Sequence, residues 1–201
     1  MTKPLPEIAE IKQLHKKYAP NEKVYELVYG HCQIVCEIAL WCADNLANDV
    51  KLNTDLLKAS CLLHDIGSYA FFDENGKVTN ERLYPQHAIL GARILEDEGF
   101  GKKIVDTVST HVLLGLSKQE IIDIPWYLPE RDYMPTSLEG ELLCYADRFH
   151  SKHPTFNTYD TFLAKLKRSL PLQAERFELW RERFGLPDVP RLAEKYNQPI
   201  R

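Results

Sequence analysis

Hydrophobic residues recur at steps of three and four along much of the chain, which is the period of an amphipathic helix. The strongest pattern runs from residue 22 to about residue 46 and includes Val24, Leu27, Val28, His31, Ile34, Val35, Ile38 and Cys42. Asn21 precedes it, and its side chain can accept a hydrogen bond from a free amide of the first turn. The pattern predicts one long helix over 22–46.

Further helices are predicted downstream. The segment 54–64 has almost no polar face, so we expect a buried helix there, with Gly67 in the left-handed conformation that ends helices. Helices are also expected over 84–99, from about Gly101 through His111, and over 117–122.

Two loops interrupt this series. Residues 68–83 contain Asn75-Gly76, a turn or hairpin signal, and residues 124–135 hold three prolines among aromatic residues. Thr136 and Glu139 have the spacing of a capping box and predict a helix through Phe149. Two or three more amphipathic helices are expected over 158–196. The fold class is therefore predicted to be all-α, as a single domain over 1–201 with a core at 22–153 and a C-terminal helical extension at 158–196.

Composition narrows the partners. The 201 residues are 44% hydrophobic and 27% charged, which is typical of a globular protein, and the net charge is -4 without a basic run longer than a pair. We therefore expect no nucleic-acid polymer as partner. Without a long apolar stretch, we also expect a cytoplasmic protein with no membrane contact. Five cysteines without a C-x-x-C motif are interpreted as reduced core thiols.

Ionisable residues fall where the predicted helices should be buried. They are four histidines and two aspartates: His31, His64, Asp65, His87, His111 and Asp147. Each alone fits a hydrogen-bonded core residue or a surface carboxylate. Together they predict a shared partner such as a metal, because an unpaired buried ionisable group costs several kcal/mol. The remaining histidines, His15, His150 and His153, lie among polar residues and are expected at the surface.

The segment Leu62-Leu63-His64-Asp65-Ile66-Gly67 resembles the central motif of the HD-domain superfamily of metal-dependent phosphohydrolases, in its HDIG form. His31 before it and His87, His111 and Asp147 after it follow the family's order, and the resemblance covers about 22–153. It implies an HD-domain helical bundle with a dinuclear metal site, in which the first histidine, the HD pair and the last aspartate hold one metal. His64 and Asp65 are the candidate catalytic residues.

The donor set agrees with that implication. Imidazole and carboxylate together suit Fe, Mn, Zn, Co or Ni better than Mg or Ca. We expect two divalent ions, with Asp65 as the bridge, His31, His64 and Asp147 on one side, and His87 and His111 on the other. Two such ions would leave a net positive charge facing an anionic substrate, and they can generate hydroxide for an in-line phosphoryl displacement.

Substrate contacts are weakly marked. Arg82, Arg131, Arg148 and Lys152 are candidate phosphate ligands, and Tyr69, Trp126 and Tyr133 are candidate base-stacking residues. Many members of the family carry a lysine directly after HDIG, where this chain has Ser68, so the leaving-group acid is unassigned. The GYP motif of the cyclic-di-GMP phosphodiesterases is missing too. A phosphomonoester or a nucleotide, including a nucleoside polyphosphate, is the expected substrate, and the C-terminal extension is a possible homodimer contact.

Two other functions stay open. Mixed-valence di-iron oxygenases of the same fold, which act on a small polyol or a phosphonate, use the same order of six ligands. This chain has no substrate-binding lysine directly after His111, where Val112-Leu113-Leu114-Gly115 is apolar, and this argues mildly against an oxygenase. A non-catalytic metal-stabilised or ligand-binding module is the third possibility, and the complete ligand set argues against it.

Overall fold

The computed structural model describes residues 2–47, 49–124 and 126–201. The main helices in chain order are α1 Ile8–Tyr18, α2 Glu22–Asp44, α3 Thr54–Leu63, α4 His87–Asp97, α5 Lys102–Ser109, α6 Lys118–Asp123, α7 Leu138–Ala146, α8 Tyr159–Ser169, α9 Pro171–Phe184 and α10 Val189–Tyr196. Short 3-10 turns add η1 Ile66–Phe71, η2 Tyr84–Gln86 and η3 Asp147–Phe149, and a small hairpin pairs β1 His150–Ser151 with β2 Thr155–Phe156. The predicted all-α class is confirmed.

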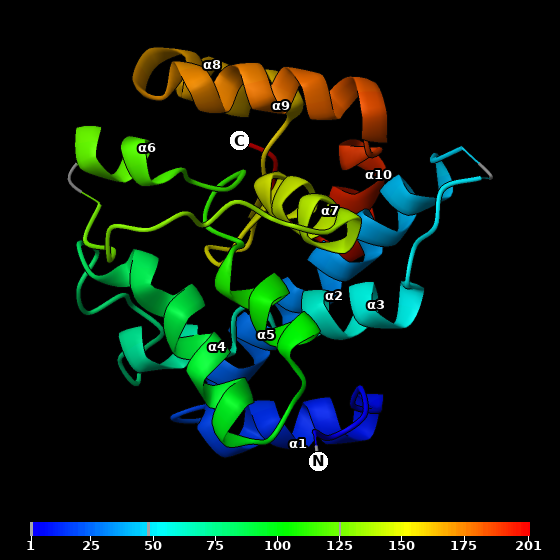
Figure 1. The fold of residues 1–201 in the computed structure, drawn as a ribbon. Coiled ribbons are helices and arrows are strands. Elements are labelled where there is room, and N and C mark those ends of the chain that lie inside the picture. Colours follow the sequence, from blue (N-terminus) through cyan, green and yellow to red (C-terminus); the bar gives the residue numbers. More distant parts are fainter. Residues whose placement is uncertain (1, 48, 125) are drawn as a thin grey trace.

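The long helix α2 runs through the centre of the structure (Figure 1). It packs against α3 and α7, while α4 packs against α5 and η1, and α8 packs against α9. Helix α1 lies at one end of the molecule, and α8 and α9 lie at the opposite end. The buried face of α2 carries the residues with helical spacing identified in the sequence, except Leu27, which is partly buried, so the hydrophobic pattern decided which side of this helix faces the core.

Several predicted local features are present. The Asn21 side chain accepts from the Val24 amide at 3.0 Å, which caps α2 as expected. Gly76 has φ +78° in a turn closed by Asp73, whose carboxylate accepts from the amides of Asn75 and Lys77. All five cysteines are free and buried. Pro125 of the loop at 124–135 lies outside the described residues.

The interpretation of Gly67 as a left-handed helix end is wrong. Gly67 lies inside η1, without a positive φ, and its role is close packing: a Cβ at this position would lie 2.2 Å from the His87 carbonyl oxygen and 2.3 Å from the Gly91 amide nitrogen of α4. Absence of a side chain therefore lets the segment after His64-Asp65 contact the backbone of α4 directly.

The start of α7 was predicted one residue early. Ser137, not Thr136, is the cap, because its hydroxyl accepts from the Gly140 amide at 3.2 Å. The helix ends at Ala146 and the chain tightens into η3, so Asp147 lies at a helix end. Helix α1 and the β1–β2 hairpin were not predicted.

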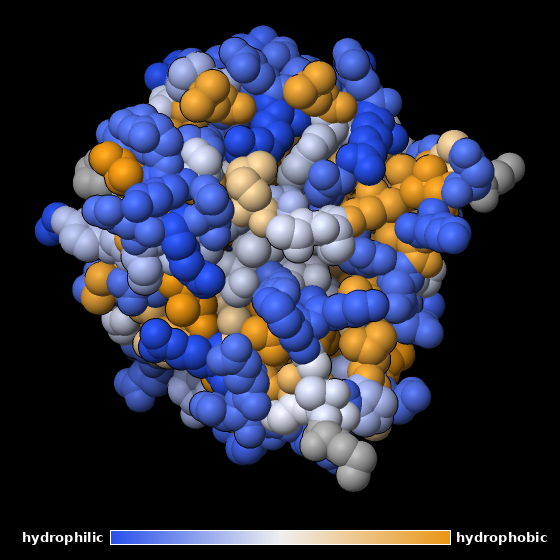
Figure 2. Space-filling model, viewed as in Figure 1, coloured by the Kyte–Doolittle hydropathy of each residue, from blue (hydrophilic) through white to orange (hydrophobic). Residues whose placement is uncertain are grey.

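Hydrophobic residues appear on the face in Figure 2 as patches separated by hydrophilic residues.

Across the described part of the chain, no helix is both long enough and apolar enough to cross a bilayer.

Candidate metal centre

The structure brings the six ionisable residues into one cluster. His31 comes from the middle of α2, His64 and Asp65 directly follow α3, and Asp147 directly follows α7. His87 is the first residue of α4, and His111 lies two residues beyond α5. Four of the six side chains are at most 1% exposed, and those of His87 and Asp147 are each 11% exposed. The cluster is thus buried at the meeting point of five helices.

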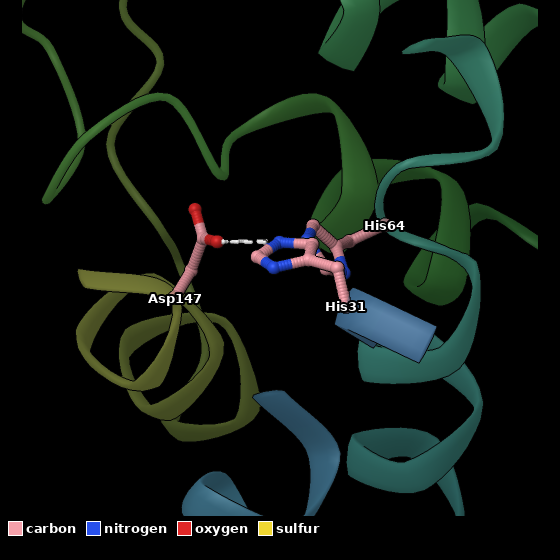
Figure 3. A group of neighbouring side chains, drawn as sticks. All are labelled: His31, His64 and Asp147. Atoms are coloured by element: carbon pink, nitrogen blue, oxygen red, sulfur yellow. Dashed lines mark hydrogen bonds and ion pairs between the residues drawn. The ribbon is translucent and has the colours of Figure 1, made fainter. Parts of the chain in front are cut away.

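Three of these residues, His31, His64 and Asp147, form what we call the His31 group (Figure 3). His31 Nε2 lies 3.0 Å and His64 Nε2 lies 3.7 Å from Oδ1 of Asp147. The two imidazole Nε2 atoms are 3.3 Å apart. All these atoms lie within the span of one metal ion's ligands.

The other three, Asp65, His87 and His111, form the His87 group. The Nε2 atoms of His87 and His111 lie 3.2 and 3.7 Å from Oδ1 of Asp65 and 3.0 Å from each other. The second oxygen of Asp65, Oδ2, lies 3.2 Å from Nε2 of both His31 and His64. Asp65 therefore directs one carboxylate oxygen toward each group.

Three of the histidines are oriented by the carbonyl three residues earlier in the chain. Nδ1 of His64 donates to Cys61 O at 2.8 Å, Nδ1 of His87 donates to Tyr84 O at 2.6 Å, and Nδ1 of His111 donates to Val108 O at 2.5 Å. A carbonyl can only accept, so each Nδ1 carries a proton, and in the neutral imidazole Nε2 then presents its lone pair to the cluster. This is the tautomer that metal-binding histidines require.

His31 is oriented differently, by a histidine that was expected at the surface. Its Nδ1 lies 2.8 Å from Nδ1 of His150, and His150 Nε2 lies 2.7 Å from Gln198 Oε1. His150 is only 5% exposed, because the β1–β2 hairpin and the C-terminal residues cover it. The expectation for His150 is therefore wrong: its polar neighbours in sequence do not determine its burial.

The expectation for His15 is also wrong. It is fully buried, with Nε2 donating to Leu62 O at 2.7 Å and Nδ1 accepting from the Tyr69 hydroxyl at 2.7 Å. These bonds tie α1 to the segment that carries His64 and Asp65. His153 is exposed, as expected.

The cluster fits divalent metal ions. In the His87 group, whose two histidines are neutral, the Nε2 lone pairs face each other across 3.0 Å, an arrangement that is repulsive without a cation between them. Asp65 Oδ1 is buried and has no hydrogen-bond partner among the described residues. Imidazole and carboxylate are donors that transition metals prefer. The thiol of Cys32 also lies within reach of His64 and Asp65.

Charge in the cluster is unevenly distributed. Burial lowers the pKa of His31 to about 3 and that of His111 to about 4, and it holds the pKa of His87 well below its usual value. Burial also opposes protonation of His64, but the Asp65 carboxylate raises the pKa of His64 to about 10. Burial disfavours an ionised Asp65, yet the ammonium of Lys152 and the His64 imidazolium hold its pKa well below the usual range.

Two cations contact the candidate metal ligands. Lys152, in the turn between β1 and β2, forms an ion pair with Asp65 Oδ2, and Arg148 forms one with Asp147. Their side chains are only 15% and 12% exposed, although charged residues near helix ends usually face solvent. Lys152 thus brings an ammonium to the HD pair from a distant segment, whereas Ser68, where many family members have lysine, is buried.

A cavity of about 600 Å³ opens onto the cluster. Its lining includes His31, His87, His111, Asp147, Arg148 and Lys152, and farther out Lys165, Arg168 and Arg201. Of the candidate phosphate ligands, Arg82 and Arg131 are not among the described lining residues; Arg82 lies over the ring of Tyr127 and Arg131 over that of Tyr133. Their role in substrate binding stays a prediction.

Of the aromatic residues expected to stack on a base, Trp126 lines the cavity, and its stacking role stays a prediction. Tyr133 is fully buried in a small cluster with Leu116 and Leu128, and Tyr69 is bonded to His15. These two side chains are therefore occupied by packing and by the support of α1.

Residues 28–152 match the family model for the HD domain. The match covers more than half of the chain, and the chain belongs to the HD-domain family. Family and fold together support a hydrolase of the HD type that binds divalent metal.

Curated relatives are similar over part of their length. An uncharacterized protein of Methanocaldococcus jannaschii is 32% identical over 124 residues, which are 61% of this chain and 65% of that protein. A tRNA (cytidine(56)-2'-O)-methyltransferase of Picrophilus torridus is 30% identical over 68% of this chain, and one of Thermoplasma volcanium is 27% identical over 75% of it. The chain spans only 35% and 40% of these two enzymes and less than two thirds of all three relatives.

The fold is similar to that of the HD domain of the L. monocytogenes phosphodiesterase PgpH. The TM-score is 0.55 at 18% identity, covering 92% of this chain and 98% of that one. The same domain in complex with cyclic-di-AMP gives a TM-score of 0.55 at 19% identity, covering 96% and 99%.

Proposed function

We propose that this protein is a metal-dependent phosphohydrolase that acts on a phosphomonoester or a nucleotide. The observation that carries the proposal is the position of Asp65, which directs Oδ2 to the His31 group and Oδ1 to the His87 group. A carboxylate placed in this way can bridge two ions. The proposed cofactors are two divalent transition-metal ions, Fe, Mn, Zn, Co or Ni, held by His31, His64, Asp65, His87, His111 and Asp147.

When bound, two such ions would supply a hydroxide near neutral pH and would neutralise the charge that develops on phosphorus-bound oxygens. The chain's own residues must hold them in fixed positions. Asp65 and His64 are the proposed catalytic residues, because Asp65 faces both groups and His64 Nε2 lies 3.2 Å from its Oδ2. The backbone carbonyl of Cys61 fixes the imidazole of His64, and burial excludes bulk water from its surroundings.

Arg148 and Lys152 are the proposed phosphate ligands. Both line the cavity, and both pair with carboxylates that would also bind metal. Their positive charges can bind phosphate oxygens at the cavity wall, and guanidinium does so with two parallel hydrogen bonds. Lys152 is also a candidate for the role that a lysine after HDIG would have. Arg82 and Arg131 are retained as predicted contacts for a substrate that reaches beyond the cavity.

The substrate class follows from size and charge. A cavity of about 600 Å³ accommodates a nucleotide-sized ligand, and the exposed residues Lys165, Arg168 and Arg201 add positive charge to its lining. This distribution favours a nucleotide, including a nucleoside polyphosphate, over a small uncharged ester. The complex of the PgpH domain with cyclic-di-AMP supports including cyclic dinucleotides in a screen. A homodimer is proposed through α9, where Leu172 and Leu179 are 57% and 65% exposed.

The test is metal analysis of protein purified with and without air, combined with a phosphatase and nucleotide screen with Mn, Fe, Co and Ni added back. Two metals per chain and oxygen-independent release of phosphate are the expected result. Two irons with a mixed-valence signal and no phosphate release would overturn the proposal in favour of the oxygenase alternative.

A further inference from the structure

His31 has a difficulty that the other three histidines of the cluster do not share. His64, His87 and His111 each lie at or just beyond a helix end, where the ladder of helical hydrogen bonds leaves acceptor capacity on nearby carbonyls. His31 lies in the middle of the 23-residue helix α2, where the carbonyls of the preceding turn are engaged by the helix itself. Its Nδ1 therefore needs an acceptor from elsewhere in the fold.

That acceptor is His150, and its proton position is determined in turn by Gln198. The amide oxygen of Gln198 can only accept, so His150 Nε2 donates to it and a neutral His150 has a bare Nδ1. His31 Nδ1 then donates to His150 Nδ1 across 2.8 Å. The remaining nitrogen of His31, Nε2, is left with its lone pair directed toward Asp65 and Asp147.

We propose that Gln198 is a positioning residue of the metal centre, which acts through His150 to hold the metal-binding tautomer and orientation of His31. The inference rests on the proposed metal centre, and it assigns a role to a residue that lies outside the segment matching the HD-domain model, 28–152.

The C-terminal segment is built to hold Gln198 in place. The backbone N–H of Gln198 donates to Ala193 O. The tail also pairs with Phe156 of β2: Phe156 N donates to Pro199 O and Arg201 N donates to Phe156 O, each at 2.8 Å. Helix α10 is tied to α2 itself, because Lys195 Nζ and the Tyr196 hydroxyl bond Glu37 at 2.7 and 2.5 Å. The tail is thus fixed against the helix that carries His31 and against the hairpin that carries His150.

Three variants of the full chain test the proposal. Gln198→Met keeps the size of the side chain and removes the acceptor, whereas Gln198→Glu keeps an acceptor. Ile200→Ala loosens the packing of the same tail and leaves the hydrogen bonds from Gln198 through His150 to His31 in place. We expect Gln198→Met to lower the affinity for one of the two bound Co²⁺ ions by about 10- to 100-fold in an absorption titration, because loss of a hydrogen-bond partner of a ligand has an effect of this size. Gln198→Glu and Ile200→Ala should bind both ions as the unmodified protein does.

A second readout reports the proton positions directly. In the Zn²⁺-loaded protein, long-range ¹⁵N–¹H spectra should show protons on Nδ1 of His31 and on Nε2 of His150. In Gln198→Met the proton of His150 should no longer be confined to Nε2. Unchanged affinity and unchanged spectra in Gln198→Met would overturn the role of Gln198, and so would equal weakening in Ile200→Ala. Failure of the unmodified chain to bind any metal would instead overturn the proposed function.

Discussion

His111 is oriented by the carbonyl of Val108, three residues earlier, whereas His31 is oriented by His150, 119 residues away in sequence. The two groups of candidate ligands differ in a similar way, although His64 of the His31 group also uses a local carbonyl. Both histidines of the His87 group use local carbonyls, and they line the cavity. The His31 group depends on both ends of the chain, through His15 on one side and Gln198 on the other. A compact family motif is therefore completed by residues that lie outside it.

The largest expected effect comes from removing the residue that both groups share. Asp65→Ala should abolish the loading of both metals and the hydrolytic activity together, because each group loses a carboxylate oxygen. Metal content by mass spectrometry and phosphate release measure this. Asp65→Asn, which preserves shape, guards against a folding defect, and Asp106→Ala on the exposed face of α5 serves as control. Full activity in Asp65→Ala would show that the site is assigned wrongly.

The next effect separates the groups. His111→Ala should lose one metal and leave the fold nearly intact, and His31→Ala should lose the other, since each removes one ligand from one group only. Metal stoichiometry and circular dichroism of the two variants check this. If His111→Ala still held two ions, His111 would not be a ligand; if either variant lost both, the groups would not be independent.

The contact between the segment that follows Asp65 and the backbone of α4 can be tested at Gly67. Gly67→Ala should lower the free energy of unfolding by about 3 kcal/mol, because the new Cβ would overlap the backbone of α4 at His87 and Gly91. Gly30→Ala in α2 is the matched control: nothing lies within 4 Å of its Cβ position, so alanine should stabilise the helix by up to about 1 kcal/mol. Urea denaturation measures both, and equal stability of the two variants would contradict the packing argument.

The smallest effect at neutral pH is the dependence of stability on pH through His15, which grows as the solution becomes acidic. Burial lowers the pKa of His15 to about 4, with the charges of His64 and Asp65 and the hydroxyl of Tyr69 nearby. Its unfolded pKa is about 6.5, so between pH 6.5 and pH 4 the unfolded chain binds more protons. The free energy of unfolding should therefore fall as the pH falls through this window, by up to about 3 kcal/mol from this group.

His15→Gln retains a donor for Leu62 O and an acceptor for Tyr69 but cannot be protonated. Urea denaturation from pH 4 to pH 6.5 at saturating Mn²⁺ should show a shallower slope for this variant, and the exposed His153→Gln should show the slope of the unmodified chain. Parallel slopes for His15→Gln and the unmodified chain would remove His15 from the account.

The sequence by itself determined the helical class, the order of the six candidate ligands and most helix boundaries. Periodic hydrophobic positions, the Asn21 cap and the HDIG segment are local signals, and a helix carries its pattern in consecutive residues. The carbonyls that orient His64, His87 and His111 are local as well, because each lies one turn earlier in the same segment.

Only the tertiary structure decided the roles of His15, His150, Lys152 and Gly67. His150 and Lys152 lie among polar residues, and their burial comes from the C-terminal tail and the cavity wall, which are far away in sequence. Gly67 has a motif position that two explanations fit, a left-handed turn or a close approach, and the contact with α4 distinguishes them. Burial and contact depend on what packs against a residue, and no local pattern contains that information.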